Sequence, residues 1–189
     1  MQGTRICLAL TDRTEMQRIK AFLTANGFVV VDEAQDGASA IRRIRALRPD
    51  LVLVDYDLPG LSGLQIAKIA EEDRICPAIV VRTGSREELK GDPDIAYLFR
   101  PITKSALLQT IHLVLLSYRK VLRLQDEITQ LRGSLLARKT IEKAKGILMS
   151  KWGISEEEAY RWMQKISMDR GVSMKDLAQS IVKEFEING

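Results

Sequence analysis

LVLVDYDLPGLSG, residues 51–63, places the carboxylate of Asp55 directly after an apolar run and before a Pro/Gly turn. A continuous apolar run of this length is typical of a strand that is buried on both faces of a parallel sheet. In an open parallel sheet the functional site lies beyond the carboxyl ends of the strands. Asp55 is therefore a candidate site residue.

Short apolar runs alternate with segments of helical periodicity on both sides of this stretch. The runs are ICLAL (6–10), FVVVDEA (28–34), LVLVD (51–55), AIVVRT (78–83) and AYLF (96–99). Strands separated by helices favour an α/β fold, and we predict a doubly wound, five-stranded parallel sheet over residues 1–118. The loop after Leu10, Asp55 and Thr83 would then meet at one edge of the sheet. Between Thr83 and Arg100 there is room for only a reduced fourth helix.

Three features of this region resemble the receiver domain of response regulators in two-component systems. They are the motif D-x-x-[LM]-P-x-x-x-G that begins at Asp55, a Thr at the end of the fourth run, and an aromatic residue three positions before a basic–Pro pair. The resemblance covers roughly residues 4–118 and implies a flavodoxin-like fold. It also implies that Asp55 is the phosphoacceptor and that Thr83, Tyr97 and Arg100 form the receiver switch.

At the metal site this sequence differs from the family that it resembles. Phosphoryl transfer to a carboxylate needs a divalent cation and a fixed cation to balance the developing negative charge. The acidic pair that holds the metal in this family is replaced by Leu10 and Thr11, which leaves Asp12 and Asp55 as metal candidates. Arg100 stands where the family has Lys, and the two cations are not equivalent. We expect Mg²⁺ only if phosphorylation is retained.

Two alternatives for Asp55 stay open at this point. In one, a sensor kinase phosphorylates it. In the other, Asp55 is a retained residue and a partner protein at the receiver takes over control.

The segment 105–136 contains no Pro and only one Gly. Its apolar residues follow heptad-like spacings of three and four, in two series that share Val121: Leu107, Ile111, Val114, Tyr118 and Val121, then Val121, Leu124, Ile128, Leu131 and Leu135. Such spacing predicts that the last receiver helix extends into a parallel coiled coil of a homodimer, with a stutter at Val121. The alternative is one long helix that packs back on its own domain.

Residues 136–189 are predicted to form three helices with one small core. The first ends near Trp152, and capping boxes at Ser155 and Ser173 begin the other two. Trp162 lies on the apolar spacing and is expected in this core.

RK-x-I-E-x-AKG-I-L-M followed by S-E-E-E-AY resembles the ANTAR domain, the RNA-binding module of transcription antitermination regulators, over residues 136–186. The resemblance implies binding of paired hairpins in nascent leader transcripts, so that a terminator fails to form.

The residues we expect to contact RNA are cations on one side of the first helix, a glycine that allows close approach, and nearby aromatic and basic residues. They are Arg138, Lys139, Lys143, Lys145, Gly146, Trp152, Tyr160 and Arg161. The plainer alternative is a solvated helix face whose charge is diluted by Glu142 and Glu156–Glu158, with Trp152 packed against the bundle.

The remaining sequence features narrow the class of protein. There is no nucleophile–base pair or nucleotide-binding loop, so we expect no enzyme. Neither a membrane-length apolar run nor a signal-peptide pattern occurs, so we expect a cytoplasmic protein. The alternative functions are a DNA-binding response regulator and a protein-interaction or sequestering module. The input signal, the cognate kinase or inhibitor, the target transcripts with their RNA sequence, and the resting oligomeric state do not follow from the sequence.

Overall fold

The chain divides into two compact units, Met1–Val121 and Leu122–Gly189. The structure is a computed structural model that describes residues 3–84 and 94–187. The first unit contains β1 (Arg5–Ala9), α1 (Arg13–Ala25), β2 (Val29–Ala34), α2 (Gly37–Leu47), β3 (Leu51–Asp55), α3 (Gly63–Glu72), β4 (Ala78–Arg82) and β5 (Ala96–Phe99). Helix α4 (Lys104–Trp152) begins in the first unit and ends in the second, which also contains α5 (Glu156–Arg170) and α6 (Met174–Ile187).

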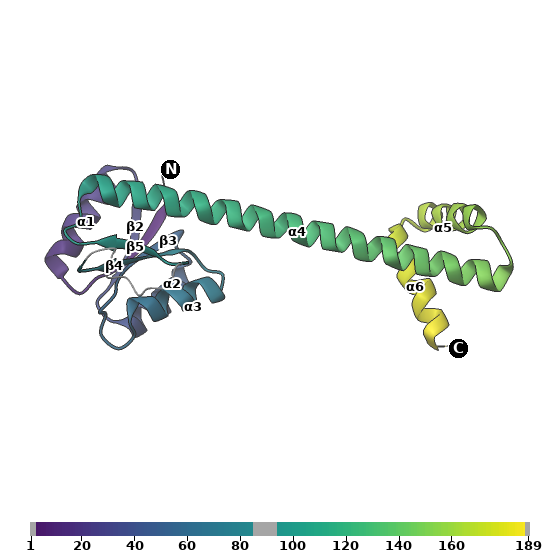
Figure 1. Ribbon diagram of the computed structural model, residues 1–189, viewed down its shortest axis with the longest axis horizontal. Coiled ribbons are helices and arrows are strands. Elements are labelled where there is room, and N and C mark those ends of the chain that lie inside the picture. Colours follow the sequence, from purple (N-terminus) through teal and green to yellow (C-terminus); the bar gives the residue numbers. More distant parts are fainter. Residues whose placement is uncertain (1–2, 85–93, 188–189) are drawn as a thin grey trace. The chain divides into compact units, whose positions relative to one another are not determined.

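The predicted doubly wound sheet is confirmed. Five strands pair in the order β2-β1-β3-β4-β5, and every pairing is parallel. Helix α1 and the first part of α4 cover one face of the sheet, while α2 and α3 cover the other (Figure 1). The reduced fourth helix expected between Thr83 and Arg100 falls mainly on residues 85–93, which lie outside the described residues.

Strand β3 shows why its sequence is continuously apolar. Leu51 and Leu53 pack into the core under α1 and α4, whereas Val52 and Val54 pack into the core under α2 and α3. Successive side chains of a strand point to opposite faces, so a strand covered on both sides needs apolar residues at every position. Asp55 ends this strand and breaks the pattern.

Helix α4 meets different surroundings along its 49 residues. Leu107, Ile111 and Leu115 are buried against the sheet, so the first heptad series serves mainly the receiver core. Leu107 and Ile111 thus belong to the last receiver helix, and the coiled coil that is expected to extend from this helix stays a prediction. The second series differs, because its five apolar side chains, from Val121 to Leu135, are between 47% and 61% exposed.

The second unit is a small three-helix arrangement with its own core. Buried apolar residues come from α4, α5 and α6: Ala144, Leu148, Ala159, Met163, Leu177, Ala178 and Ile181. The capping box predicted at Ser155 is present. Ser173 accepts a hydrogen bond from the backbone of Asp176 at 3.1 Å and so caps α6 as expected. Trp162 was wrongly expected in this core, since it is 36% exposed.

Among the described residues, no helix has both the length and the apolar character needed to cross a bilayer.

The glycine that closes the motif beginning at Asp55 has a steric reason. Gly63 begins α3 directly beside the end of β3, where an added Cβ would lie 2.3 Å from the carbonyl oxygen of Asp55. Only a residue without a side chain lets the helix start so close to the strand. The motif therefore fixes how α3 approaches the site.

We expect Gly63→Ala to destabilise the first unit by about 1–3 kcal/mol, because the methyl group would force the backbone apart. Gly133→Ala is the matched control: its added methyl group meets no atom within 4 Å, and it should stabilise helix α4 by about 0.5–1 kcal/mol. Urea unfolding followed by circular dichroism measures both changes. Similar effects of the two substitutions would contradict the steric explanation.

Candidate functional site

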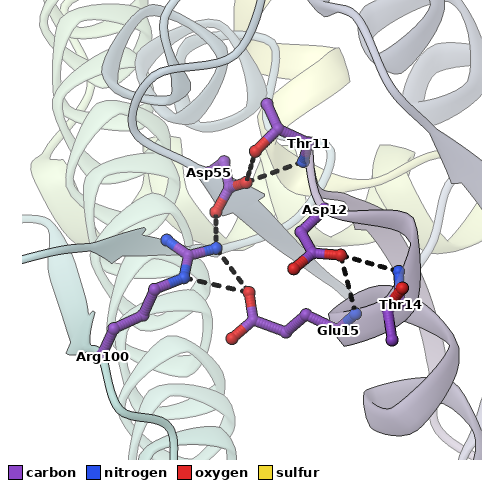
Figure 2. Close-up of polar contacts among 6 residues, drawn as sticks. All are labelled: Thr11, Asp12, Thr14, Glu15, Asp55 and Arg100. Carbon is purple, nitrogen blue, oxygen red and sulfur yellow. Dashed lines mark hydrogen bonds and ion pairs between the residues drawn. The ribbon is translucent and has the colours of Figure 1, made fainter.

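Asp55 lies at the carboxyl end of β3 and is only 2% exposed. One of its oxygens, Oδ2, accepts hydrogen bonds from the backbone nitrogen of Thr11 at 2.7 Å and from the Thr11 hydroxyl at 2.5 Å. The loop after β1 and the end of β3 thus meet, as the topology predicts. Thr11, which stands at a position where the family has an acid, here supplies two donors to Asp55 (Figure 2).

The second carboxylate oxygen of Asp55 is held by Arg100, which follows β5. The Arg100 guanidinium forms an ion pair with Asp55 Oδ1 and also donates to Glu15 Oε2, at 3.0 Å from Nε and 2.6 Å from Nη2. Burial acts to lower the pKa of Arg100, but the hydrogen bonds to Glu15 and Asp55 outweigh it and raise that pKa. A permanent cation therefore lies between two carboxylates (Figure 2).

Glu15 is the member of this site that sequence reasoning missed. It lies in the first turn of α1, 85 positions before Arg100, and no motif joins the two residues. The sequence carries no signal for this contact, because the two residues come together only in the folded domain.

The residues around Asp55, with the contacts they make in the structure, do not fit a magnesium ion. Asp12, one of the two metal candidates, caps helix α1 by accepting from the backbone nitrogens of Thr14 at 2.8 Å and Glu15 at 3.2 Å. Both oxygens of Asp55 have other partners, and Leu10 is buried in the core. Within residues 3–84 and 94–187, no group of three or more His, Cys, Asp or Glu side chains could hold a metal ion.

The two other predicted switch residues lie apart from the Asp55 contacts. Thr83 follows β4 and is exposed, and Tyr97 is half-buried and packs against the core under α2 and α3. In the part of the chain that the structure describes, the hydrogen-bond partners of the Asp55 carboxylate are Thr11 and Arg100, and neither Thr83 nor Tyr97 is among them. Arg82 instead places its guanidinium 4.9 Å from the centre of the Tyr56 ring.

The second candidate site is the helical surface of the second unit. Arg138, Lys139 and Gly146 are exposed on α4, and Lys143 is exposed as well. Arg161 is exposed on α5 and forms an ion pair with Glu157. These residues supply a partly neutralised cationic surface.

Lys145 behaves differently from the other predicted RNA-binding cations, because it is only 6% exposed. Its ammonium lies 2.8 Å from Glu142 Oε2 and 2.7 Å from Glu156 Oε1. Hydrogen bonds to Glu142 and Glu156 raise the pKa of Lys145, and the bond from Lys145 lowers the pKa of Glu156. The ion pair with Glu156 joins α4 to the first turn of α5, and the Tyr160 ring centre lies 6.0 Å from the ammonium.

Two family models match the chain. The response regulator receiver domain matches residues 6–112, and the ANTAR domain matches residues 129–182. The receiver match covers the sheet and its helices, and the ANTAR match covers the end of α4, all of α5 and most of α6.

The chain is similar over nearly its whole length to the transcriptional regulatory protein PdtaR of Mycobacterium tuberculosis. The two are 31% identical over 183 residues, which is 95% of this chain and 89% of that protein. Protein PilH of Pseudomonas aeruginosa is 36% identical over 121 residues, 59% of this chain and 97% of PilH.

Solved receiver domains share the fold of the first unit. One is the receiver domain of a sensor histidine kinase from Pseudomonas aeruginosa, whose structure holds a magnesium ion in the active-site cleft. It is 24% identical, has a TM-score of 0.50, and covers 60% of this chain and 98% of that chain. The likeness concerns the fold, and the magnesium ion belongs to that protein.

We expect Arg100→Met to lower the free energy of unfolding of the first unit by about 1–3 kcal/mol, because it leaves buried Asp55 without its counterion. Asp55→Asn combined with Arg100→Met should recover part of that loss, since no uncompensated charge stays buried at residue 55. Urea unfolding of the wild type, both single variants and the double variant measures the coupling. Strictly additive losses would contradict the described ion pair.

Proposed function

This chain belongs to the response regulators that join a receiver domain to a C-terminal ANTAR domain, and we propose here how its two units act together. As a member of this family it is an RNA-binding regulator of transcription antitermination, and the family is a regulatory one, not a class of enzymes. The observation that carries this function is the ANTAR match over residues 129–182. The proposal places the chain in the cytoplasm, where nascent leader transcripts are made.

The RNA-binding surface in this proposal is the exposed cationic side of α4. Arg138, Lys139 and Lys143 supply charge, and Gly146 leaves open space in which a phosphate or base can come close to the helix backbone. In this proposal Tyr160, whose ring centre lies 6.0 Å from the Lys145 ammonium, and Arg161 extend the surface onto α5. Unpaired loop bases and phosphates of a hairpin suit such a combination of charge and access.

Lys145 has a separate part in the proposal. For the direct RNA contact expected from the sequence, its ammonium would have to leave both Glu142 and Glu156. We assign it instead to positioning: the ion pair with Glu156 holds the start of α5 against α4 and so sets the distance between the surfaces of the two helices.

The functional form that we propose is a homodimer. The exposed heptad series from Val121 to Leu135 is an apolar stripe of the kind that a second identical helix covers in a coiled coil. Charged residues flank it, among them Arg123, Glu127 and Arg132. A dimer carries two RNA-binding units, and the second contact to a two-hairpin transcript is then intramolecular, which raises avidity.

Control of the receiver is proposed to pass through a partner protein instead of phosphorylation of Asp55. The Arg100 guanidinium already supplies the charge balance for which receivers commonly use Mg²⁺, and Thr11 saturates the other carboxylate oxygen. The competing proposal keeps Asp55 as the phosphoacceptor of a sensor kinase. The two make opposite predictions for a small phosphodonor.

We expect incubation with acetyl phosphate and magnesium to leave the intact mass of the wild type unchanged. The variant Leu10→Asp/Thr11→Asp/Arg100→Lys restores the acidic pair and the compact ammonium, and it should gain one phosphoryl group. Adding Asp55→Asn to that variant should abolish the gain. A phosphoryl group on the wild type that disappears in Asp55→Asn would favour the sensor-kinase proposal.

We expect the wild type to bind selected RNAs with two tandem hairpins far more tightly than duplex DNA at the same salt concentration. The probe is a pool of such RNAs with randomised loops, from which bound molecules are recovered. Arg138→Gln and Lys139→Gln should each weaken binding and reduce the slope of log K against log salt by about 1, because each cation contacts one phosphate. Lys175→Gln, an exposed cation on α6, is the control and should change neither value.

The same titration separates the rival functions. Tighter binding to duplex DNA would identify a DNA-binding response regulator. Binding to neither nucleic acid would leave the protein-interaction module. In a terminator read-through assay, the wild type should raise the yield of full-length transcript only when the leader carries both selected hairpins.

A further inference from the structure

The only two tryptophans of the chain form an exposed pair in the second unit. The rings of Trp152 and Trp162 meet edge to face, with centroids 4.8 Å apart and an interplanar angle of 81°. Trp152 is 51% exposed and Trp162 is 36% exposed. Tryptophan gains stability from burial, so two large rings that stay this accessible are not explained by the core of the unit.

The pair is fixed in place by local structure on both sides. Trp152 ends α4, and Gly153 follows with φ +66°, a conformation that allows the sharp turn toward α5. The capping box of Ser155 and Glu158 then begins α5, and Met163 beside Trp162 is fully buried. A site held this way loses little conformational entropy when a ligand binds.

The geometry leaves ring surface available for stacking. In an edge-to-face pair the edge of one ring covers a single face of the other ring, so the pair leaves the remaining ring faces uncovered and a third flat group has room to stack. Lys165 lies on the same side of α5, three positions after Trp162, and is exposed. An aromatic surface beside a cation suits a flat base attached to a phosphate.

We propose that the Trp152–Trp162 pair is a stacking site for one unpaired base of the RNA hairpin. The proposal rests on the RNA-binding function given above and adds a site and a ligand class to it: a nucleobase displayed in a loop, bound through its face and not through its hydrogen-bonding edge. Both tryptophans lie within the ANTAR match, residues 129–182, which favours RNA over a partner protein as the occupant. Stacking of this kind tolerates different bases.

The first measurement uses the wild-type full-length chain. Its tryptophan fluorescence arises from this pair alone, so titration with the selected two-hairpin RNA should quench or shift the emission with the same Kd as filter binding. The same RNA with abasic nucleotides replacing single loop residues keeps every phosphate. One abasic position should weaken binding about 5- to 150-fold and remove the fluorescence change.

The second measurement uses variants of each tryptophan. Trp152→Leu and Trp162→Leu should each weaken hairpin binding about 5- to 150-fold and leave the salt dependence of binding unchanged, because stacking releases no counterions. Trp152→Phe and Trp162→Phe keep an aromatic ring and should retain more of the affinity. Met168→Leu, an exposed apolar residue of α5 outside the pair, is the control for surface substitution.

Combining the two measurements tests contact directly. The abasic position that weakens binding to the wild type should not weaken binding to Trp152→Leu any further, since the ring on which the base stacked is gone.

If the wild type binds the hairpins but no abasic position changes the fluorescence, the stacking site is refuted and the RNA-binding function survives. If the wild type binds no hairpin, both fall. Leucine variants that alter the oligomeric mass but not RNA affinity would identify a protein contact and overturn the proposal.

Discussion

A carboxylate as deeply buried as that of Asp55 requires a partner of opposite charge, because burying an isolated charge costs far more than folding can supply. In this chain the partner is a side chain of the protein itself, Arg100. The Arg100 guanidinium holds Asp55, Glu15 holds the guanidinium, and the Thr11 hydroxyl and backbone nitrogen hold the other oxygen. The ends of β1, β3 and β5 and the first turn of α1 are thus connected by contacts between the chain's own residues. This arrangement explains how Asp55 persists although the acidic pair of the receiver family is absent.

The parts of the structure that follow from local pattern could be predicted, and those that depend on distant partners could not. The continuous apolar run of β3 predicted a doubly covered strand, and the Ser155 capping box predicted where α5 begins. Glu15 was missed because its role exists only once Arg100 is folded beside it. Lys145 was expected to contact RNA. In the sequence, Glu142 and Glu156 indicate only a lower net charge of this surface, not that they form ion pairs with Lys145. Helical spacing alone cannot tell whether Trp162 lies just inside or just outside a small core.

Helix α4 combines three roles that its sequence assigns in succession. Its first turns complete the receiver core through Leu107 and Ile111, its middle exposes the apolar stripe from Val121 to Leu135, and its last turns supply Ala144 and Leu148 to the second core. The same spacing of three and four serves each role, which is why the first heptad series resembled a dimer seam. What distinguishes the roles is which other elements lie beside the helix. A partner that binds or leaves the exposed stripe would therefore contact the one helix that belongs to both units.

The permanent guanidinium at Asp55 also affects how long a response lasts and which other signals can reach the receiver. A receiver that works through an aspartyl phosphate is switched off by hydrolysis, and it is open to any donor that reaches the carboxylate. In the proposed partner-controlled mode there is no bond to hydrolyse, so the duration of the response is set by the rate at which the partner dissociates. Neighbouring kinases and small phosphodonors would have no effect on such a protein. The Arg100–Asp55 pair would then give the cell a regulator that ignores phosphate-based cross-talk and responds to protein abundance.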